Sequence, residues 1–386
     1  MAAKELRIAI IGYNFMGKAH SNAWLQASRF FEPALRPVLQ VACGRNESAL
    51  RSFADNWGWK HIETDWRKAI ERDDVDVVDI SLPQHLHHEV AIAAAKAGKH
   101  LFCEKPMALS AAHAEEMLRA AEAAGVRHYV NHNYRRTPAV RLARQLIDEG
   151  KIGRIFHWRG AYQQDWIVDP EFPLTWHLRK ETAGSGPHGD LNSHSVDLAH
   201  YLVGDIKTVS CLTANFITER PLPGEGAATF SAGSGGASAR GPVTVEDASL
   251  MMVQFANGAV GSFEATRFAP GRKNRNTFEI YGSEGALVFD LERMNELQFH
   301  SRTDPEHAQG FRTIIATESC HPYIKHWWPP GHVIGYEHEF THAVVDFVDA
   351  VASGKPIEPN FHDGVKCIRV LEAGLKSAAS GKRETV

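Results

Sequence analysis

The first third of the chain alternates short apolar runs with amphipathic segments. Residues 7–11, a short β-branched run, and residues 38–43 each predict a strand, and residues 75–82, which are rich in Val and Ile, predict a fully buried one. Helical spacing follows at 47–56 and 90–97. Alternating buried strands and helices are typical of a doubly wound parallel sheet. We therefore predict an α/β fold whose N-terminal half is a Rossmann domain.

The second half changes to strands that alternate apolar and polar residues. Asn257-Gly258, a strong hairpin signal, joins two of them. We predict strands at 154–162, 206–218, 248–255, 260–267, 277–281 and 286–290, and helices at 138–149, 340–352 and 365–377. These elements predict a C-terminal α/β domain with a large, mostly antiparallel open sheet. The expected domains are 1–130, for dinucleotide binding, and 131–386, for substrate binding and oligomerisation. We predict a surface loop at 220–242, and the pattern of 321–332 assigns that segment to neither helix nor strand.

A glycine-rich segment from Gly184 leads into a strongly apolar helix that ends near Gly204. On its wheel Asp190 and His194 fall on one stripe, together with Asp197 and Tyr201. A carboxylate one turn from an imidazole fixes the ring's tautomer and makes it a good proton acceptor. The alternative is an ordinary Asp–His pair that ties a helix to the core.

The first predicted strand ends at Gly12 and continues as Gly12-Tyr-Asn-Phe-Met-Gly17 into a helix. Such a helix N-terminus favours a diphosphate, because free N–H groups and the helix dipole point at it. Asn14 stands where the fingerprint has its middle glycine, so a plain strand–turn–helix connection is the alternative. After the second strand comes Gly44-Arg45-Asn46, without the acidic residue that accepts ribose hydroxyls; Arg45 could meet a 2′-phosphate or adenine, or be a solvated surface arginine.

Three further segments contain side chains that could bind a ligand. His85-x-His87 follows the third strand and could open a metal site, but no further cluster completes one. Lys105 follows a buried run, where open α/β sheets bind ligands. Trp166, next to Gln163 and Gln164, offers a flat apolar face and amide groups, as a carbohydrate site requires; a core tryptophan is the alternative.

Charge and cysteine content exclude several kinds of partner. The net charge is −4 and the basic residues are scattered, so we expect neither nucleic acid nor membrane as a partner. The five cysteines lie far apart without a Cys-x-x-Cys motif, which indicates a reducing compartment. With no signal-peptide pattern at the N-terminus, we expect a cytoplasmic protein that binds a small molecule and no metal.

In four motifs the chain resembles the Gfo/Idh/MocA oxidoreductase family. They are Gly12-x-x-x-Met16-Gly17-x-x-His20, Pro83-x-x-x-His87, Cys103-Glu104-Lys105-Pro106 and Gly189-Asp190-x-x-x-His194-x-x-Asp197. The departures are Asn14 for glycine, and Leu82 and Gln84 where Thr-Pro-Asn is common. The resemblance implies a Rossmann domain and a second α/β domain whose open sheet is commonly covered by another subunit.

The resemblance also implies the site residues. The catalytic positions are Lys105, Asp190 and His194, with His194 as general acid/base, Lys105 orienting the hydroxyl and sharing its proton, and Asp190 as charge partner of His194 and hydroxyl acceptor. The cofactor positions are Gly12, Asn14, Phe15, Met16, Gly17, Arg45, Pro83, His87, Glu104 and Lys105. The substrate positions are Tyr134, Arg135, Gln164, Trp166, Asp190 and His194.

The expected activity is hydride transfer between NAD or NADP and a secondary hydroxyl of a sugar, glycoside or polyol. The alternatives are a glycosidase that oxidises its sugar transiently on retained NAD, and a regulator that binds the cofactor without catalysis. Because the strands from 248 to 290 carry apolar residues toward both faces, we expect a homo-oligomer, a dimer or tetramer, joined through the C-terminal sheet.

Overall fold

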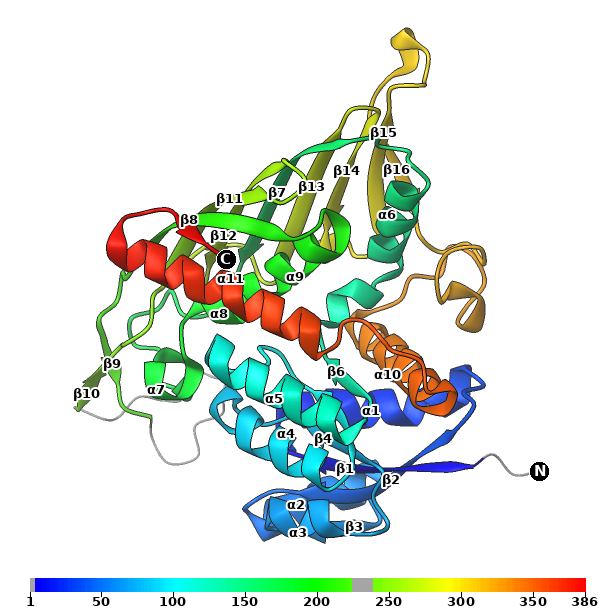
Figure 1. The fold of residues 1–386 in the computed structure, drawn as a ribbon, viewed down its shortest axis with the longest axis vertical. Helices are drawn as coiled ribbons and strands as arrows, with labels where there is room; N and C mark the ends of the chain where they lie inside the picture. The colour runs from blue at the N-terminus through cyan, green and yellow to red at the C-terminus, as the bar shows by residue number, and fades with distance from the viewer. Residues whose placement is uncertain (1–3, 224–238) are drawn as a thin grey trace. The chain divides into compact units, whose positions relative to one another are not determined.

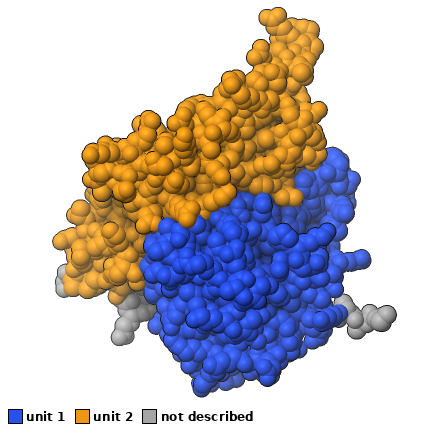
Figure 2. Space-filling model, in the orientation of Figure 1, with its two compact units in different colours: residues 1–137, 317–365 blue, residues 138–316, 366–386 orange. Residues whose placement is uncertain are grey.

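The computed structural model describes residues 4–223 and 239–386 and divides the chain into two compact units (Figure 2). Unit 1 contains residues 1–137 and 317–365, and unit 2 contains 138–316 and 366–386. The sequence assigned all of 131–386 to the second domain. The segment 317–365 instead joins unit 1, because its long helix packs against the first helix of the chain.

Unit 1 is built on six parallel strands in the order β3-β2-β1-β4-β5-β6. They are β1 (Glu5–Ile11), β2 (Arg36–Cys43), β3 (His61–Glu63), β4 (Val77–Ile80), β5 (His100–Cys103) and β6 (His128–Val130). The strand order reverses between β1 and β4, and ligands of open α/β sheets bind at such a switch point. The predicted doubly wound parallel sheet is confirmed.

Helices cover both faces of this sheet (Figure 1). They are α1 (Phe15–Phe30), α2 (Glu47–Trp57), α3 (Trp66–Glu71), α4 (His87–Lys96), α5 (Ala111–Ala124) and α10 (Tyr336–Ser353). α4 packs with α5, and α1 packs with α10. One core cluster joins Ile8 and Ile10 of the sheet to Trp24 of α1 and Phe347 of α10.

The aromatic segment that the sequence left unassigned lies against α10. The ring of Tyr323 stacks on His342 at 4.1 Å, and Trp327 Nε1 donates a hydrogen bond to His342 Nε2 over 2.7 Å. Trp327 also packs on Phe30 and Phe31 at the end of α1. No periodicity predicts this segment, because single aromatic residues of an irregular stretch make its contacts with the helices.

Unit 2 contains a nine-stranded sheet in the order β16-β15-β14-β13-β7-β12-β11-β8-β17. Its strands are β7 (Ile155–Gln163), β8 (Ile206–Ala214), β11 (Ala248–Phe255), β12 (Val260–Thr266), β13 (Arg275–Gly282), β14 (Gly285–Asp290), β15 (Glu296–Ser301), β16 (Arg312–Ile315) and β17 (Glu384–Thr385). All neighbours are antiparallel except β7 and β12. The predicted sheet and its Asn257-Gly258 hairpin are confirmed.

Helices cover one face of this sheet. They are α6 (Pro138–Asp148), α8 (Pro187–Asp190), α9 (Asn192–Leu202) and α11 (Phe361–Ser380), whose first turn is grouped with unit 1. The short helix α7 (Lys180–Ala183) lies beside the ribbon of β9 (Glu219–Pro221) and β10 (Arg240–Pro242) (Figure 1). His188 links α8 to β11 and to α11. Its ring nitrogens lie 2.8 Å from Ser249 Oγ of β11 and 2.7 Å from the Leu371 carbonyl oxygen of α11.

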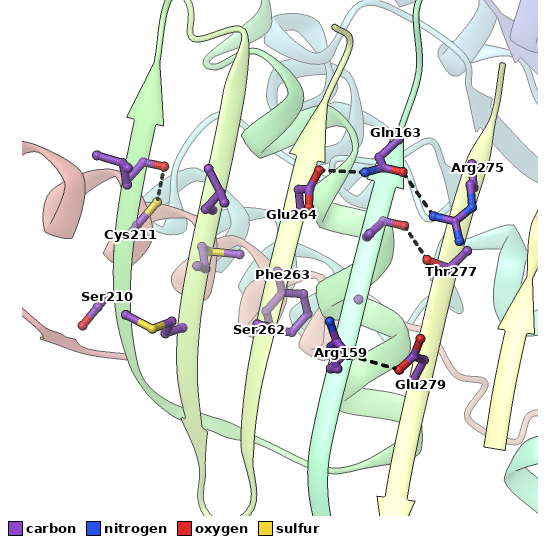
Figure 3. Close-up of a pocket in the computed structure, with 16 residues that line it drawn as sticks. Arg159, Gln163, Ser210, Cys211, Ser262, Phe263, Glu264, Arg275, Thr277 and Glu279 are labelled. Atoms are coloured by element: carbon purple, nitrogen blue, oxygen red, sulfur yellow. Dashed lines mark hydrogen bonds and ion pairs between the residues drawn. The ribbon is translucent and has the colours of Figure 1, made fainter. Parts of the chain in front are cut away.

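The other face is open and carries a hollow of about 670 Å³ (Figure 3). On β8 and β11 this face exposes three large apolar side chains: Leu212, Leu250 and Met252 are 66%, 47% and 69% exposed. On β7, β12 and β13 it is polar, with Gln163 donating to Glu264 and accepting from Arg275. The expectation of apolar residues on both faces therefore holds for only part of the sheet.

The predicted loop at 220–242 begins and ends in paired backbone. β9 (Glu219–Pro221) and β10 (Arg240–Pro242) form a two-stranded antiparallel ribbon. The side chain of Arg220, in β9, is buried. The loop prediction is thus wrong at its two ends. Its centre, 224–238, lies outside the described residues.

Candidate functional site

The turn between β1 and α1 brings backbone groups into close contact. Gly12 has φ +109°, and a Cβ atom there would lie 2.3 Å from the Ser81 carbonyl oxygen. A Cβ at Gly17 would lie 2.3 Å from the Gly12 carbonyl oxygen. Only glycines fit such a turn, and the N-terminus of α1 is left open beside the exposed Asn14 and Phe15. Met16 is half-buried. This cradle fits a diphosphate.

Arg45 stands at the carboxyl end of β2 with an exposed side chain. Its neighbours have structural tasks. Asn46 caps α2, its side-chain oxygen accepting from Ala49 N over 3.0 Å, and the Tyr13 ring covers Gly44, where a Cβ would lie 2.3 Å from it. Of the three residues after β2, Arg45 is therefore the one whose side chain is available to a ligand.

His87 joins the loops that follow β4 and β5. Its Nε2 lies 2.8 Å from the Leu82 carbonyl oxygen and its Nδ1 lies 3.0 Å from that of Pro106. Burial lowers the pKa of His87, so the ring is neutral and donates to one of these carbonyls. His87 thus supports the Pro83 and Lys105 loops from inside, while His85 is exposed; the two do not form a common ligand set.

Lys105 lies two residues after the end of β5 and is half-buried. Its backbone N–H donates to Glu104 Oε2 over 3.2 Å. Glu104 in turn is held by His20 and Asn131, at 2.9 and 2.6 Å from its Oε1. The sequence singled out Glu104 and Lys105 and included His20 in a motif, but it did not predict that His20 and Asn131 hold Glu104.

Tyr134 and Arg135 lie in a 3-10 turn (Asn133–Arg136) inside unit 1. They are 3% and 2% exposed, and Arg135 Nη2 lies 3.3 Å from Asp363 Oδ1. The buried Glu339 of α10 holds this turn by accepting hydrogen bonds from Asn133 and Thr137. Both predicted substrate residues are therefore fixed in place, with little of their surface accessible.

Asp190 and His194 lie on two short helices rather than one. α8 ends at Asp190 and α9 begins at Asn192, and the His194 N–H donates to the Leu191 carbonyl oxygen three residues back. The predicted continuous helix is broken at Leu191. His194 is 5% exposed, whereas the Asp190 side chain is 31% exposed.

The ion pair of Asp190 is with Arg267, which directly follows β12. Arg267 Nη2 lies 2.6 Å from Asp190 Oδ2, and the guanidinium carbon lies 5.1 Å from the centre of the Trp166 ring. Arg267 is 1% exposed, and among the described residues its Nε and Nη1 have no hydrogen-bond partner. One buried cation thus contacts both a predicted catalytic carboxylate and a predicted sugar-stacking ring.

A chain of hydrogen bonds leads from Trp166 to Tyr162, whose ring packs beside that of His194. Trp166 Nε1 donates to Gln164 Oε1 over 2.8 Å, and Gln164 Nε2 donates to Asn274 Oδ1 over 2.9 Å. The same oxygen accepts from Tyr162 Oη over 2.7 Å, and the Tyr162 ring lies 5.8 Å from the His194 ring. We call this group of side chains the Asp190 cluster; it consists of Tyr162, Gln164, Trp166, Asp190, His194, Arg267 and Asn274.

The Asp190 cluster contains every predicted site residue of unit 2. The sequence missed Tyr162, Arg267 and Asn274. Each lies at or next to a strand end. This position is the one feature of the sequence that could have identified them, because none of the three belongs to a motif. Within residues 4–223 and 239–386, no three His, Cys, Asp or Glu side chains are grouped to hold a metal. No helix in these ranges is long and apolar enough to cross a membrane.

Two family models match the chain. Residues 6–132 match the oxidoreductase family with an NAD-binding Rossmann fold, and residues 140–288 match the GFO/IDH/MocA C-terminal domain. Levoglucosan dehydrogenase of Pseudarthrobacter phenanthrenivorans is 45% identical over 378 residues, 97% of each chain.

Two solved structures cover 99% of this chain and are themselves covered to 99%. An oxidoreductase domain protein from Kribbella flavida is 50% identical with a TM-score of 0.94. Levoglucosan dehydrogenase in complex with NADH and levoglucosan is 42% identical with a TM-score of 0.94. The chain, from its Rossmann sheet to its open antiparallel sheet, belongs to the Gfo/Idh/MocA oxidoreductase family.

Proposed function

We propose that the protein is an NAD-dependent dehydrogenase that oxidises a secondary hydroxyl of an uncharged sugar, glycoside or polyol. The observation that carries this proposal is the Asp190 cluster, which combines a carboxylate, an imidazole, amide groups and a partly exposed tryptophan within one unit. Relatives that span the whole chain, levoglucosan dehydrogenase among them, support the substrate class.

The residues of unit 1 fit a dinucleotide. Gly12, Gly17 and the N-terminus of α1 would hold the diphosphate, with Asn14, Phe15 and Met16 around it. Pro83 and the backbone around Glu104 and Lys105 would meet the nicotinamide end, supported from inside by His87. When bound, the nicotinamide supplies the chemistry of hydride transfer.

His194 is the proposed general acid/base, which takes the hydroxyl proton during oxidation. Lys105 orients the same hydroxyl and shares its proton. Asp190 accepts a hydrogen bond from a substrate hydroxyl; Arg267 engages its Oδ2, and the side chain remains 31% exposed. The role of charge partner to His194 is weakened in this account, because a fixed guanidinium already compensates the Asp190 charge.

Trp166 and Gln164 are the proposed platform for the sugar ring. The charge of Arg267 is committed to Asp190, and its remaining donors are buried. It is therefore poorly placed to bind a carboxylate or phosphate on the substrate, and this supports an uncharged one.

NADP is a proposed second cofactor. Arg45 is exposed at the end of β2 and no acidic residue follows that strand directly, so a 2′-phosphate would meet a cation there rather than a carboxylate.

We further propose that the open face of the unit 2 sheet binds a second copy of the chain, giving a dimer or tetramer. The face combines exposed Leu212, Leu250 and Met252 with paired polar residues, a mixture typical of interfaces between subunits.

We also propose a cytoplasmic location, because the state of the cysteines fits a reducing compartment. No disulfide joins any of the five, and Cys43, Cys103 and Cys367 are buried.

A substrate panel tests the function. Levoglucosan, glucose, myo-inositol, a glycoside and glucuronate are each incubated with NAD and with NADP, and formation of reduced cofactor and cleavage of the glycoside are both followed. Net NADH formation with uncharged sugars supports the proposal. Glycoside cleavage without net NADH would indicate the redox-assisted glycosidase, and cofactor binding without any turnover would indicate the regulator.

A further inference from the structure

His20 of α1 is fully buried between two carboxylates, outside the residues used in the proposed reaction. Its Nδ1 lies 2.8 and 3.0 Å from the two carboxylate oxygens of Asp79, and its Nε2 lies 2.9 Å from Glu104 Oε1. Its ring packs on Phe102 and Phe340. A neutral imidazole has one N–H, so it could satisfy only one of these carboxylates.

The two carboxylates are themselves held by further donors. Trp24 Nε1 donates to Asp79 Oδ2 over 2.7 Å, and Ser81 Oγ donates to Asp79 Oδ1 over 3.0 Å. Asn131 Nδ2 donates to Glu104 Oε1 over 2.6 Å. The group therefore has an Asp79 side and a Glu104 side, which meet at the imidazole of His20.

The Glu104 side reaches Lys105. Glu104 Oε2 accepts a hydrogen bond from the Lys105 backbone N–H over 3.2 Å. Burial alone would raise the pKa of Glu104, but His20, Lys105 and Asn131 together lower it, so the carboxyl is ionised. Any displacement of Glu104 would be transmitted to the residue next to it.

We propose that His20 is a positioning residue: as an imidazolium it joins Asp79 to Glu104 and so fixes Glu104 and the Lys105 that follows it. The proposal rests on the proposed function only where Lys105 is assigned to the reaction. It predicts a charged ring in the core of unit 1, with one carboxylate on each side.

The protonation state is consistent with the surroundings of the ring. Burial lowers the pKa of His20, yet the charges and hydrogen bonds of Asp79 and Glu104 outweigh burial and raise it to about 10. The ring therefore keeps its charge from neutral pH to about pH 9.

Nuclear magnetic resonance of the wild-type protein with 15N-labelled histidine tests the charge. At pH 9 we expect a histidine ring with both nitrogens protonated, because its two carboxylate neighbours raise the pKa of His20 to about 10. Its signals should be absent from His20→Gln. A spectrum with only neutral rings would overturn the proposal.

Two variants of the same buried group test the positioning. In His20→Gln we expect kcat for sugar oxidation to fall roughly tenfold to a hundredfold, as for a misplaced catalytic group, with NADH affinity nearly unchanged. Trp24→Phe breaks a hydrogen bond on the Asp79 side and should lower stability but not kcat. Equal losses of kcat in both variants, or a normal kcat in His20→Gln, would overturn the proposal.

If His20→Gln does not fold, Asn131→Ala takes its place, because it removes a hydrogen bond to Glu104. This variant should then show the loss of kcat, and a normal kcat in Asn131→Ala would contradict the proposal.

Labelling of lysines separates this proposal from the proposed function. In His20→Gln, Glu104 loses the imidazolium that holds it, so the Lys105 that follows it is no longer fixed. We expect the rate at which Lys105 reacts with trinitrobenzenesulfonate to rise severalfold, measured by peptide mass spectrometry against exposed Lys60, and to be unchanged in Trp24→Phe. An unchanged Lys105 rate in His20→Gln would overturn the positioning role, whereas a wild-type enzyme that oxidises no sugar would overturn only the proposed function.

Discussion

Arg267 donates a hydrogen bond from Nη2 to Oδ2 of Asp190 over 2.6 Å, from a side chain that is 1% exposed. The two residues are 77 positions apart in the sequence. This ion pair changes the account of Asp190, which the sequence presented as the partner of His194. With a guanidinium beside it, Asp190 is a fixed, acceptor-only group suited to a sugar hydroxyl.

The first prediction follows from that pair. Arg267→Gln should lower kcat/KM for the sugar roughly tenfold to a hundredfold, about 1.4 to 2.7 kcal/mol, mainly by raising KM, because Asp190 and Trp166 both lose their support. NADH affinity, measured by fluorescence titration, should stay unchanged. Arg293→Gln removes an exposed pair with Glu296 and is the control; a loss of the same size there would contradict a specific role for Arg267.

The second prediction concerns Arg45 and the choice of cofactor. Arg45→Ala should weaken NADP binding by about 1.5 to 3 kcal/mol, because a charge-assisted contact to the 2′-phosphate is lost. NAD binding should change much less. Titration of both cofactors into both proteins decides the point, and an unchanged affinity for NADP would remove Arg45 from the cofactor site.

The third prediction concerns stability. Burial raises the pKa of Glu339 to about 8, so this residue is protonated in the native state and ionised in the unfolded state between about pH 5 and pH 8. Across this window its contribution to the free energy of unfolding falls as pH rises, by at most about 1.4 kcal/mol per pH unit. Glu339→Gln keeps the shape and removes the ionisation, so its stability relative to wild type should grow from pH 5 to pH 8. Urea unfolding at several pH values measures this.

Glu306→Gln provides the control for Glu339, because Glu306 is exposed and forms no ion pair within the described residues. Its stability difference from wild type should be nearly independent of pH. A Glu339→Gln curve parallel to wild type would show that Glu339 is ionised in the folded protein.

The fourth prediction concerns assembly. Light scattering should give a mass at least twice the 42.8 kDa of one chain, and Leu250→Asp with Met252→Asp should reduce it to that of a monomer, because both charges fall on the open sheet face. Val333→Asp, at a residue of similar exposure in unit 1, should leave the mass unchanged. A wild-type mass near 42.8 kDa would contradict the interface.

The sequence predicts both sheets because the two halves of the chain have different periods. Continuous apolar runs such as 75–82 can only be buried on both faces, and alternation around Asn257-Gly258 can only form a hairpin. The return of 317–365 to unit 1 was missed, since packing of α10 on α1 depends on a contact between distant segments. Local periodicity cannot predict which helices far apart in the sequence pack against each other.

The Asp190 cluster shows the same division. Asp190, His194, Gln164 and Trp166 could be predicted, because motifs and a strand end mark them. Arg267 and Asn274 could not, because each is an isolated polar residue beside a strand, and its role depends on a partner far along the chain. The break at Leu191 also escaped prediction, since the apolar spacing continues through it.

The proposed catalytic role of the Asp190 cluster is tested most directly by the turnover of His194→Ala with a sugar that the wild-type enzyme oxidises. We predict a kcat lower by roughly a hundredfold or more, the usual scale for a positioned acid/base, with NADH affinity unchanged because the proposed cofactor residues belong to unit 1. Near-normal turnover in a folded variant that still binds NADH would contradict it and would leave Lys105 as the acid/base.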